Sequence, residues 1–341
     1  LELDPEGVVM LPLRGREEVV GVLSCFTGRG RPVPSGEDLE LLVDLAARAG
    51  LAVEAARLVS SQRRIAEALQ RALLTAPPQP DDLEVAVRYT PAAHSAKVGG
   101  DWYDAFVQPG GSTVLVIGDV VGHDTAAAAA MGQLRGMLRG LGVVEDVPPA
   151  QLLARLDTAM RRLEIDTTAT AVVARLEQTP AQHRAGTTTL RWSSAGHLPP
   201  VVLAPDGRAR LLGGATGLLL GLEGITGGSW RHEHTEVVPR GSTVLLCTDG
   251  LVERRDASLD DGVTQFLRAV EAARDHALDD LCDAVLLQLV PRQAPDDVAL
   301  LGVRLHPQPH LAQHRAAGPP DARAGPSERP GARHPEHRSG G

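Results

Sequence analysis

Apolar and polar residues alternate along several short segments, and this pattern predicts β-strands. Residues 7–13 and 18–26 alternate on either side of a polar turn at 14–17. Residues 83–89 do the same after a proline-rich break at 76–80. Further strands are predicted at 113–117, 169–176, 187–194, 201–204, 208–212, 236–238, 243–247 and 298–305, with a hairpin turn at 205–207.

A different spacing of apolar residues predicts helices. The longest predicted helix begins near Ser35, carries Glu37 and Asp38 in its first turn, and continues to about residue 74. Leu51, Leu58, Ile65 and Ala72 recur seven residues apart, with Leu69 on the same seam. The helix at 37–74 therefore either forms a homodimer or packs on its own domain. Other helices are predicted at 125–141, 150–163 and within 263–289.

The order of these elements indicates an α+β protein. Many strands joined by turns, with few helices, favour antiparallel layers over a Rossmann-like sheet. We predict the end of a sensor domain at 1–58, a linker helix and proline-rich boundary at 59–80, and the main domain at 81–305. The tail at 306–341 is rich in Pro and Gly and poor in large apolar residues, so we expect it to be disordered.

Composition excludes several classes of function. The chain has 341 residues, of which 43% are hydrophobic and 23% charged, and its net charge is −9. That charge argues against general nucleic-acid binding, and no apolar run is long enough for a bilayer, so we expect a cytoplasmic protein. The three cysteines are too few for a disulfide framework. Val98 follows the single lysine, Lys97, which excludes a Walker A loop.

Aspartates at the ends of predicted strands are the strongest chemical signal. Asp119 and Asp249 follow apolar strands, and Asp296-Asp297 precede another. Asp101 and Asp104 form a further acidic pair after two glycines, which would let a ligand approach. Converging carboxylates need cations between them, and Mg²⁺ or Mn²⁺ fits oxygen ligands. Two such ions would activate water for phosphoester hydrolysis. Alternatively, each aspartate taken singly is a turn residue or a helix N-cap.

Six segments extend this argument, because they occur in the order found in PPM-type metal-dependent serine/threonine phosphatases. They resemble the bacterial branch named after stage II sporulation protein E, over about residues 65–305. The segments are LQRALLTAPPQPDDLEVAVRYTPA, VGGDWYDAF, VIGDVVGHDTAAAAAMGQLRGMLR, SSAGHLPPVVL, LLCTDGLVERRD and PDDVALLGVRL. The segment VVMLPLRGREEVVGVLSCF, with the helix after it, is similar to the end of a GAF domain, and it lacks that domain's first half.

The resemblance implies an α/β/β/α sandwich of two antiparallel sheets flanked by helices, with two divalent metal ions, Mg²⁺ or Mn²⁺, at one end. It also implies a phosphoserine/phosphothreonine phosphatase whose substrate is a regulatory protein, such as an anti-anti-sigma factor in sigma-factor or stress signalling. Asp119 would bridge the metals and hold the attacking water. The other implied ligands are Asp101, the Val120 carbonyl, Asp249 and Asp296, which is favoured over Asp297.

Other residues near the implied ligands have supporting roles in the same reading. Gly100, Gly118, Gly250 and His123 would lie around the metals, and His197 would order a nearby turn. The family commonly has Gly-His-Gly after the bridging aspartate, and Asp124 stands in the third place here. Asp124 either caps the following helix or adds charge near the metals.

Two rival functions remain open at this point. One is a catalytically silent scaffold that has the phosphatase fold and binds signalling partners. The other is a metal-dependent phosphodiesterase, which differs in substrate preference. A silent site has no need for clustered, mutually repelling carboxylates, and this favours the phosphatase over the scaffold.

Overall fold

The computed structural model describes residues 7–28, 30–73, 77–80, 82–92, 99–122, 124–222, 231–254, 257–291, 294 and 296–306, and for residues 62–73 the backbone alone. His123 and all of the predicted tail except His306 therefore lie outside the described residues. Within the described part of the chain, no helix combines the length and the apolarity that a membrane span requires.

The N-terminal segment is a β-hairpin with a long helix packed on it. Strands β1 (Gly7–Arg14) and β2 (Val19–Thr27) pair antiparallel, and α1 runs over Glu37–Leu73. Gly50 allows the close contact, because a Cβ atom there would lie 2.3 Å from the Arg14 carbonyl oxygen. These three predicted elements are confirmed, and α1 continues unbroken through residues 58 and 59. The GAF likeness, the domain limits and the homodimer stay predictions.

Two five-stranded sheets follow, and all pairs of neighbouring strands within them are antiparallel. One sheet has the order β10 (His234–Pro239), β7 (Thr187–Ala195), β6 (Ala169–Glu177), β5 (Thr113–Val120), β4 (Asp101–Val107). The other has the order β3 (Leu83–Thr90), β12 (Val298–Leu305), β11 (Thr243–Cys247), β8 (Val201–Leu203), β9 (Ala209–Leu211).

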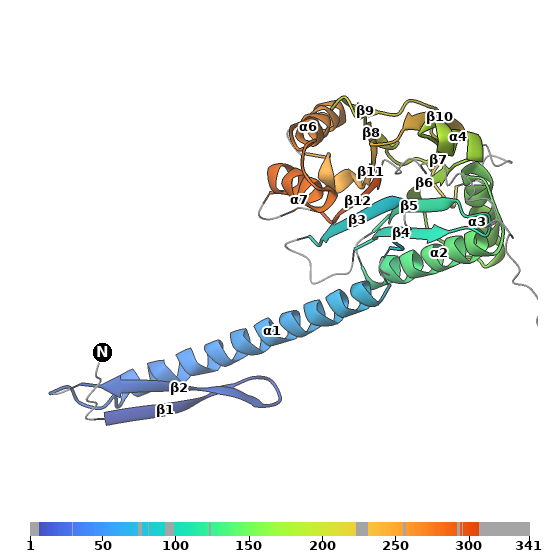
Figure 1. Cartoon of the computed structure of the whole chain (residues 1–341). Helices are drawn as coiled ribbons and strands as arrows, with labels where there is room; N and C mark the ends of the chain where they lie inside the picture. The colour runs from blue at the N-terminus through green and yellow to red at the C-terminus, as the bar shows by residue number, and fades with distance from the viewer. Residues whose placement is uncertain are drawn as a thin grey trace, which may run out of the picture. The chain divides into compact units, whose positions relative to one another are not determined.

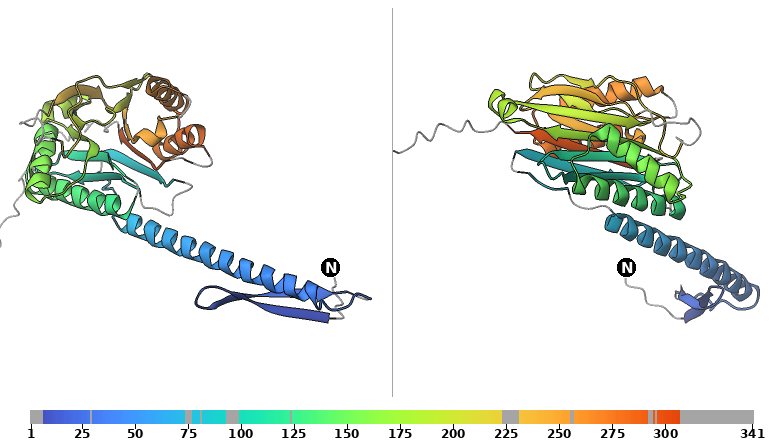
Figure 2. Two further views of the ribbon diagram at one scale, coloured as in Figure 1. Left: turned by 180° about the vertical axis from the view of Figure 1, so that it is seen from behind. Right: turned by 90° about the vertical axis from the view of Figure 1, so that its right-hand side faces the viewer.

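Helices cover the outer faces of both sheets, as Figures 1 and 2 show. Helices α2 (Thr125–Val144) and α3 (Pro149–Arg162) pack on the β4–β5–β6 side around Trp102. Helices α6 (Leu259–Ala272) and α7 (Leu278–Leu289) pack on the other sheet around Phe266. A third core lies between the sheets. The predicted α+β sandwich is confirmed, and β5 is almost wholly buried because both of its faces are covered.

Three elements differ from the sequence prediction. Strand β4 was not predicted, because its polar residues break the apolar alternation. A short helix, α4 (Pro180–Ala185), was also missed. The helical stretch predicted within 263–289 is two helices, since α6 ends at Ala272 and α7 begins at Leu278.

Candidate functional site

Strand direction brings the predicted aspartates to one end of the sandwich. Asp101 begins β4 and Asp119 lies near the end of β5, its antiparallel neighbour. Asp249 follows β11 by two residues, and Asp296-Asp297 directly precede β12, which pairs antiparallel with β11. Each sheet therefore supplies acidic residues from one strand that ends and one that begins there.

Asp101 and Asp119 form the innermost pair. They are direct partners in the β4–β5 register, and Asp101 is only 3% exposed. One carboxylate oxygen of Asp101, Oδ2, is buried and has no hydrogen-bond partner among the residues that the structure describes, while the Thr248 hydroxyl hydrogen-bonds the carboxyl group. Burial and the Asp119 charge raise the pKa of Asp101 well above its usual value. Burial and the Asp249 charge raise the pKa of Asp119 to about 7.

Asp249 and Asp296 extend this acidic group toward solvent. Asp249 opens the short 3-10 helix η1 (Asp249–Leu251). Its pKa is raised by burial and by the nearby charge of Asp296. The Asp296 side chain is exposed, and its charge also acts on Asp119.

The adjacent Asp297 is in a different environment from Asp296. It is 7% exposed, and its Oδ1 accepts a hydrogen bond of 2.8 Å from the backbone N–H of Ala92. This contact ties the end of β3 to the start of β12, which is a structural role. The arrangement supports Asp296 over Asp297 as a metal ligand. The charge of Asp297 nevertheless raises the pKa of both Asp101 and Asp119.

Asp104, which the sequence placed with Asp101, lies away from the acidic group. Side chains alternate along a strand, so residues three apart face opposite sides of the sheet. Asp104 faces α2, where it pairs with Arg139 at 2.7 Å and Arg135 at 3.4 Å. The missed strand β4 therefore contains one candidate ligand and one residue that anchors a helix.

Glycines around the site are required by the protein's own atoms. A Cβ on Gly99 would lie 1.2 Å from Asp297 Oδ2, and one on Gly100 would lie 2.2 Å from the Val120 carbonyl oxygen. A Cβ on Gly250 would lie 2.1 Å from the Asp297 carbonyl oxygen, and one on Gly118 would lie 2.4 Å from the Trp102 ring. These glycines thus allow close packing between the strands that hold the carboxylates, and the expectation that they let a ligand approach stays a prediction.

Two predicted positions around the site have clear structural roles. Asp124 is the N-cap of α2, and its Oδ1 accepts a 2.9 Å hydrogen bond from Ala127 N–H. His197 is buried, and its backbone N–H donates to Ser194 Oγ at 3.0 Å while Ser194 Oγ donates to the His197 carbonyl at 2.6 Å. The capping reading of Asp124 and the turn-ordering reading of His197 are both confirmed.

The donor chemistry of the acidic group fits hard divalent cations. Four carboxylates act on one another in sequence from Asp101 through Asp119 and Asp249 to Asp296, and one buried oxygen lacks a partner. Cations would relieve both the repulsion and the missing contact. Within the described residues, no three His, Cys, Asp or Glu side chains are arranged so that they could hold an ion as they stand. The acidic group is therefore an open series of neighbouring charges, and its side chains would have to move closer together to bind a cation.

A cavity of about 460 Å³ opens directly beside this group. Its lining includes Asp249, Glu253, Arg254 and His197, with Leu198 and Pro199 on an apolar wall. A second cavity of similar size involves Arg240, whose guanidinium is paired with Asp82 at 3.0 Å and Gln178 at 2.7 Å. The cavity beside Asp249 is the one that can serve chemistry at the carboxylates.

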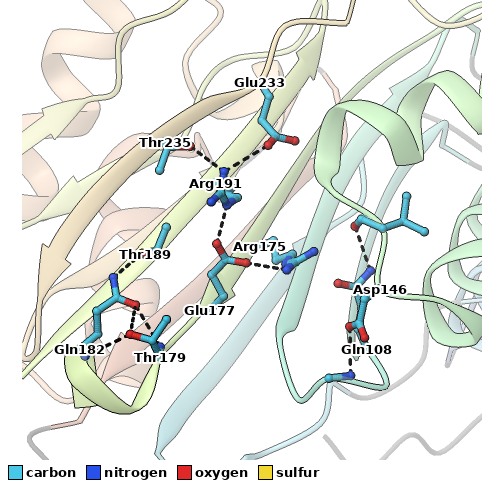
Figure 3. Close-up of polar contacts among 12 residues, drawn as sticks. Gln108, Asp146, Arg175, Glu177, Thr179, Gln182, Thr189, Arg191, Glu233 and Thr235 are labelled. Carbon is cyan, nitrogen blue, oxygen red and sulfur yellow. Dashed lines mark hydrogen bonds and ion pairs between the residues drawn. The ribbon is translucent and has the colours of Figure 1, made fainter. Parts of the chain in front are cut away.

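Charged residues on β6 and β7 are a second cluster, drawn in Figure 3. Glu177 pairs with Arg175 at 2.5 Å and with Arg191. Arg191 also reaches Glu233 at 3.4 Å and Thr235 at 3.3 Å. Burial opposes ionisation of Glu177, but the two guanidinium groups outweigh it and lower its pKa. These charges neutralise one another, in contrast to the aspartates at the other site.

Comparison with known proteins agrees with this geometry. Residues 109–306 match the family model described as Stage II sporulation protein E (SpoIIE). A structure of RsbU and RsbW domains from Mycobacterium tuberculosis is 31% identical, with a TM-score of 0.57 over 67% of this chain and 61% of that chain. This chain thus spans less than two thirds of that relative.

Two further structures share the fold at low identity. The SiaA-PP2C domain of Pseudomonas aeruginosa is 19% identical, with a TM-score of 0.55 over 74% of this chain and 99% of that one. The PP2C phosphatase domain of SpoIIE from Bacillus subtilis, with a fragment of its regulatory domain, is 14% identical, with a TM-score of 0.52 over 66% and 64%. With its sandwich and the family match over 109–306, the chain belongs to the SpoIIE family of PP2C-type phosphatases.

Proposed function

We propose that this chain is a metal-dependent phosphatase that removes phosphate from phosphoserine or phosphothreonine in a regulatory protein. The observation that carries the proposal is the convergence of Asp101, Asp119, Asp249 and Asp296 at one end of the sandwich, where one buried oxygen of Asp101 has no partner within the described part of the chain. Bound cations would relieve the mutual repulsion of these carboxylates.

Each residue has a distinct part in this proposal. Asp119 lies between the other carboxylates and would contact both ions, helped by the Val120 carbonyl. Each of the other three carboxylates would contact one of the ions, and these are Asp101, Asp249 and Asp296. The Thr248 hydroxyl orients Asp101. Two bound Mg²⁺ or Mn²⁺ ions would supply an activated water and neutralise charge on the phosphoryl oxygens. The cavity beside Asp249 has room for the phosphorylated side chain.

The kind of substrate is inferred from the family. The Mycobacterium tuberculosis relative contains RsbU and RsbW domains, and this supports a place for our chain in sigma-factor or stress signalling. A phosphorylated anti-anti-sigma factor is the proposed substrate. The −9 net charge requires that such a partner be recognised by more than general electrostatic attraction to phosphate.

Phosphate release tests the proposal directly. A phosphoserine peptide and an aryl phosphate are each incubated with Mn²⁺, Mg²⁺ or EDTA, using the native chain and Asp119→Asn. Asp275→Asn is the matched control, because Asp275 lies outside the acidic group and its side chain is 87% exposed. We expect metal-dependent release from the native chain and the control, and none from Asp119→Asn. Folded native protein that neither releases phosphate nor binds Mn²⁺ by calorimetry would support the silent scaffold instead.

A further inference from the structure

His197 connects the two sheets directly behind the acidic group. Its ring Nδ1 lies 2.8 Å from the Thr170 hydroxyl on β6, and its Nε2 lies 3.1 Å from the Cys247 carbonyl oxygen at the end of β11. The two strands belong to different sheets. The His197 side chain therefore links the two sheets at this end of the sandwich.

The partners of His197 assign the proton on its ring. A carbonyl oxygen can only accept, so Nε2 must carry the hydrogen that it donates to Cys247. Nδ1 is then unprotonated in the neutral ring, and it accepts from the Thr170 hydroxyl. Burial lowers the pKa of His197 to about 4, although the Cys247 contact opposes this shift. The ring is thus neutral near pH 7, and both of its nitrogens are occupied.

Each partner is next to a proposed metal ligand. Thr170 is the direct neighbour of Asp119 in the β5–β6 register. Cys247 immediately precedes Thr248, which bonds Asp101, and Asp249 follows. The contacts of His197 therefore hold two parts of the backbone in place. One is the part of β6 that pairs with Asp119, and the other is the end of β11, which Asp249 follows.

We propose that His197 is a positioning residue, which sets the spacing between Asp119 and Asp249 by bridging Thr170 and Cys247. This inference rests on the proposed function, because the spacing matters only if both carboxylates bind cations. His197 itself binds no ion and transfers no proton in this role, since both ring nitrogens are used within the protein. Partners that orient metal ligands in this way typically change affinity 10- to 100-fold when they are lost.

The test measures Mn²⁺ binding by calorimetry, without turnover. Thr170→Val removes the hydroxyl and keeps the side-chain shape, and His197→Leu removes both contacts. Thr188→Val is the matched control, because the buried Thr188 hydroxyl has no hydrogen-bond partner among the described residues. We expect Thr170→Val to weaken Mn²⁺ binding about 10-fold and His197→Leu to weaken it further, while the control is unchanged.

Two readouts separate positioning from general stability. Thermal unfolding in EDTA reports on stability alone. The kcat and the KM for aryl phosphate, both measured at saturating Mn²⁺, report on the geometry of the metal-bound site. We expect kcat to fall in Thr170→Val with little change in KM. Folded Thr170→Val with native Mn²⁺ affinity and kcat would overturn the role of His197 and leave the phosphatase proposal intact. A native chain that binds no Mn²⁺ would overturn both.

Discussion

Asp101 and Asp119 face each other as direct partners on β4 and β5, so two carboxyl groups lie on adjacent strands at one end of the sandwich. The β-sheet holds this pair together, whereas like charges would drive it apart. Burial raises the pKa of both groups, and the Asp119 charge raises the pKa of Asp101 further. A hydrogen bond from Asp101 acts to lower the pKa of Asp119, but burial and the charges of Asp249 and Asp296 outweigh it. The native fold thus keeps in place a local repulsion that cations would relieve.

Asp119→Asn should stabilise the metal-free protein and remove its stabilisation by metal. Because its pKa is raised to about 7, Asp119 is ionised in the folded state above that pH, and this ionised form destabilises the fold relative to the unfolded chain. Removing the charge should therefore raise the free energy of unfolding by about 1–2 kcal/mol at about pH 8 in EDTA. The gain should shrink as the pH falls below about 7 and vanish only near pH 4, where the carboxyl is protonated in the unfolded chain as well.

Thermal unfolding with Mn²⁺ completes this comparison. Mn²⁺ should raise the Tm of the native chain and of Asp275→Asn, and leave that of Asp119→Asn nearly unchanged. A metal-free Asp119→Asn protein that melts below the native chain at pH 8 would contradict the repulsion argument.

The sequence predicts most of the sandwich because its strands are built from apolar residues. Strands β11 and β12 were predicted with the observed limits, since both are continuous apolar runs covered on two faces. Strand β4 was missed because Asp104 interrupts its apolar run. Only the partners supplied by α2, Arg135 and Arg139, make a buried carboxylate tolerable there. Contacts of that kind join residues far apart in sequence, and no local pattern records them.

The site was predictable as a set of aspartates but not as a set of contacts. Asp119 and Asp249 follow from predicted strand ends, and Asp101 follows from the acidic pair after two glycines. Antiparallel pairing then places Asp101 beside Asp119, and Asp249 comes from the other sheet. The bridge made by His197 could not be predicted, because Thr170 and Cys247 become neighbours only when the two sheets stack. The Thr248 hydroxyl at the end of an apolar strand is a signal that the sequence does carry.

Gly100→Ala should disturb the site without unfolding the sandwich. The added Cβ would lie 2.2 Å from the Val120 carbonyl oxygen and 2.7 Å from Asp119 Oδ1, so β4 and β5 must separate locally. We expect a loss of about 1–3 kcal/mol in stability and weaker Mn²⁺ binding. Gly136→Ala is the control, because Gly136 lies within α2 and a Cβ there meets open space. Denaturant unfolding and calorimetry would show the contrast, and native Mn²⁺ affinity in Gly100→Ala would refute it.

Substitutions at Asp124 separate helix capping from an electrostatic effect on the metals. Asp124→Ala should cost about 1 kcal/mol of stability, because the Ala127 N–H loses its acceptor. Asp124→Asn keeps the cap and removes the charge, so stability should stay near the native value. If capping is the whole role, Mn²⁺ affinity is unchanged in Asp124→Asn. A clear shift in that affinity would show that the Asp124 charge acts on the metal site.

The buried ion pair between Asp157 and Arg231 should behave as a unit. Their side chains are 1% and 3% exposed, and Arg231 Nε lies 2.9 Å from Asp157 Oδ2. Arg231→Met leaves a buried carboxylate without its cation and should cost about 3–5 kcal/mol. Adding Asp157→Leu should recover part of this loss. Arg210→Met, which breaks the more exposed pair with Glu236, should cost less than about 1 kcal/mol. Additive effects of Arg231→Met and Asp157→Leu in a double-mutant cycle would argue against coupling.

His197 should make the metal-free protein less stable as the pH falls. Its pKa is lowered to about 4 by burial, so the unfolded chain takes up a proton near pH 6.5 and the folded chain does not. Stability is therefore full above about pH 6.5 and lost progressively toward pH 4, by about 3 kcal/mol in total. Comparison with His197→Gln in EDTA isolates this contribution, because the aspartates titrate in both proteins. The native chain should lose about 2 kcal/mol relative to His197→Gln between pH 7.5 and pH 5. Thr170→Val keeps the imidazole and is the control, because it should retain the native pH dependence. If the stability curves of the native chain and His197→Gln run parallel instead, His197 is protonated as easily in the folded state as in the unfolded state.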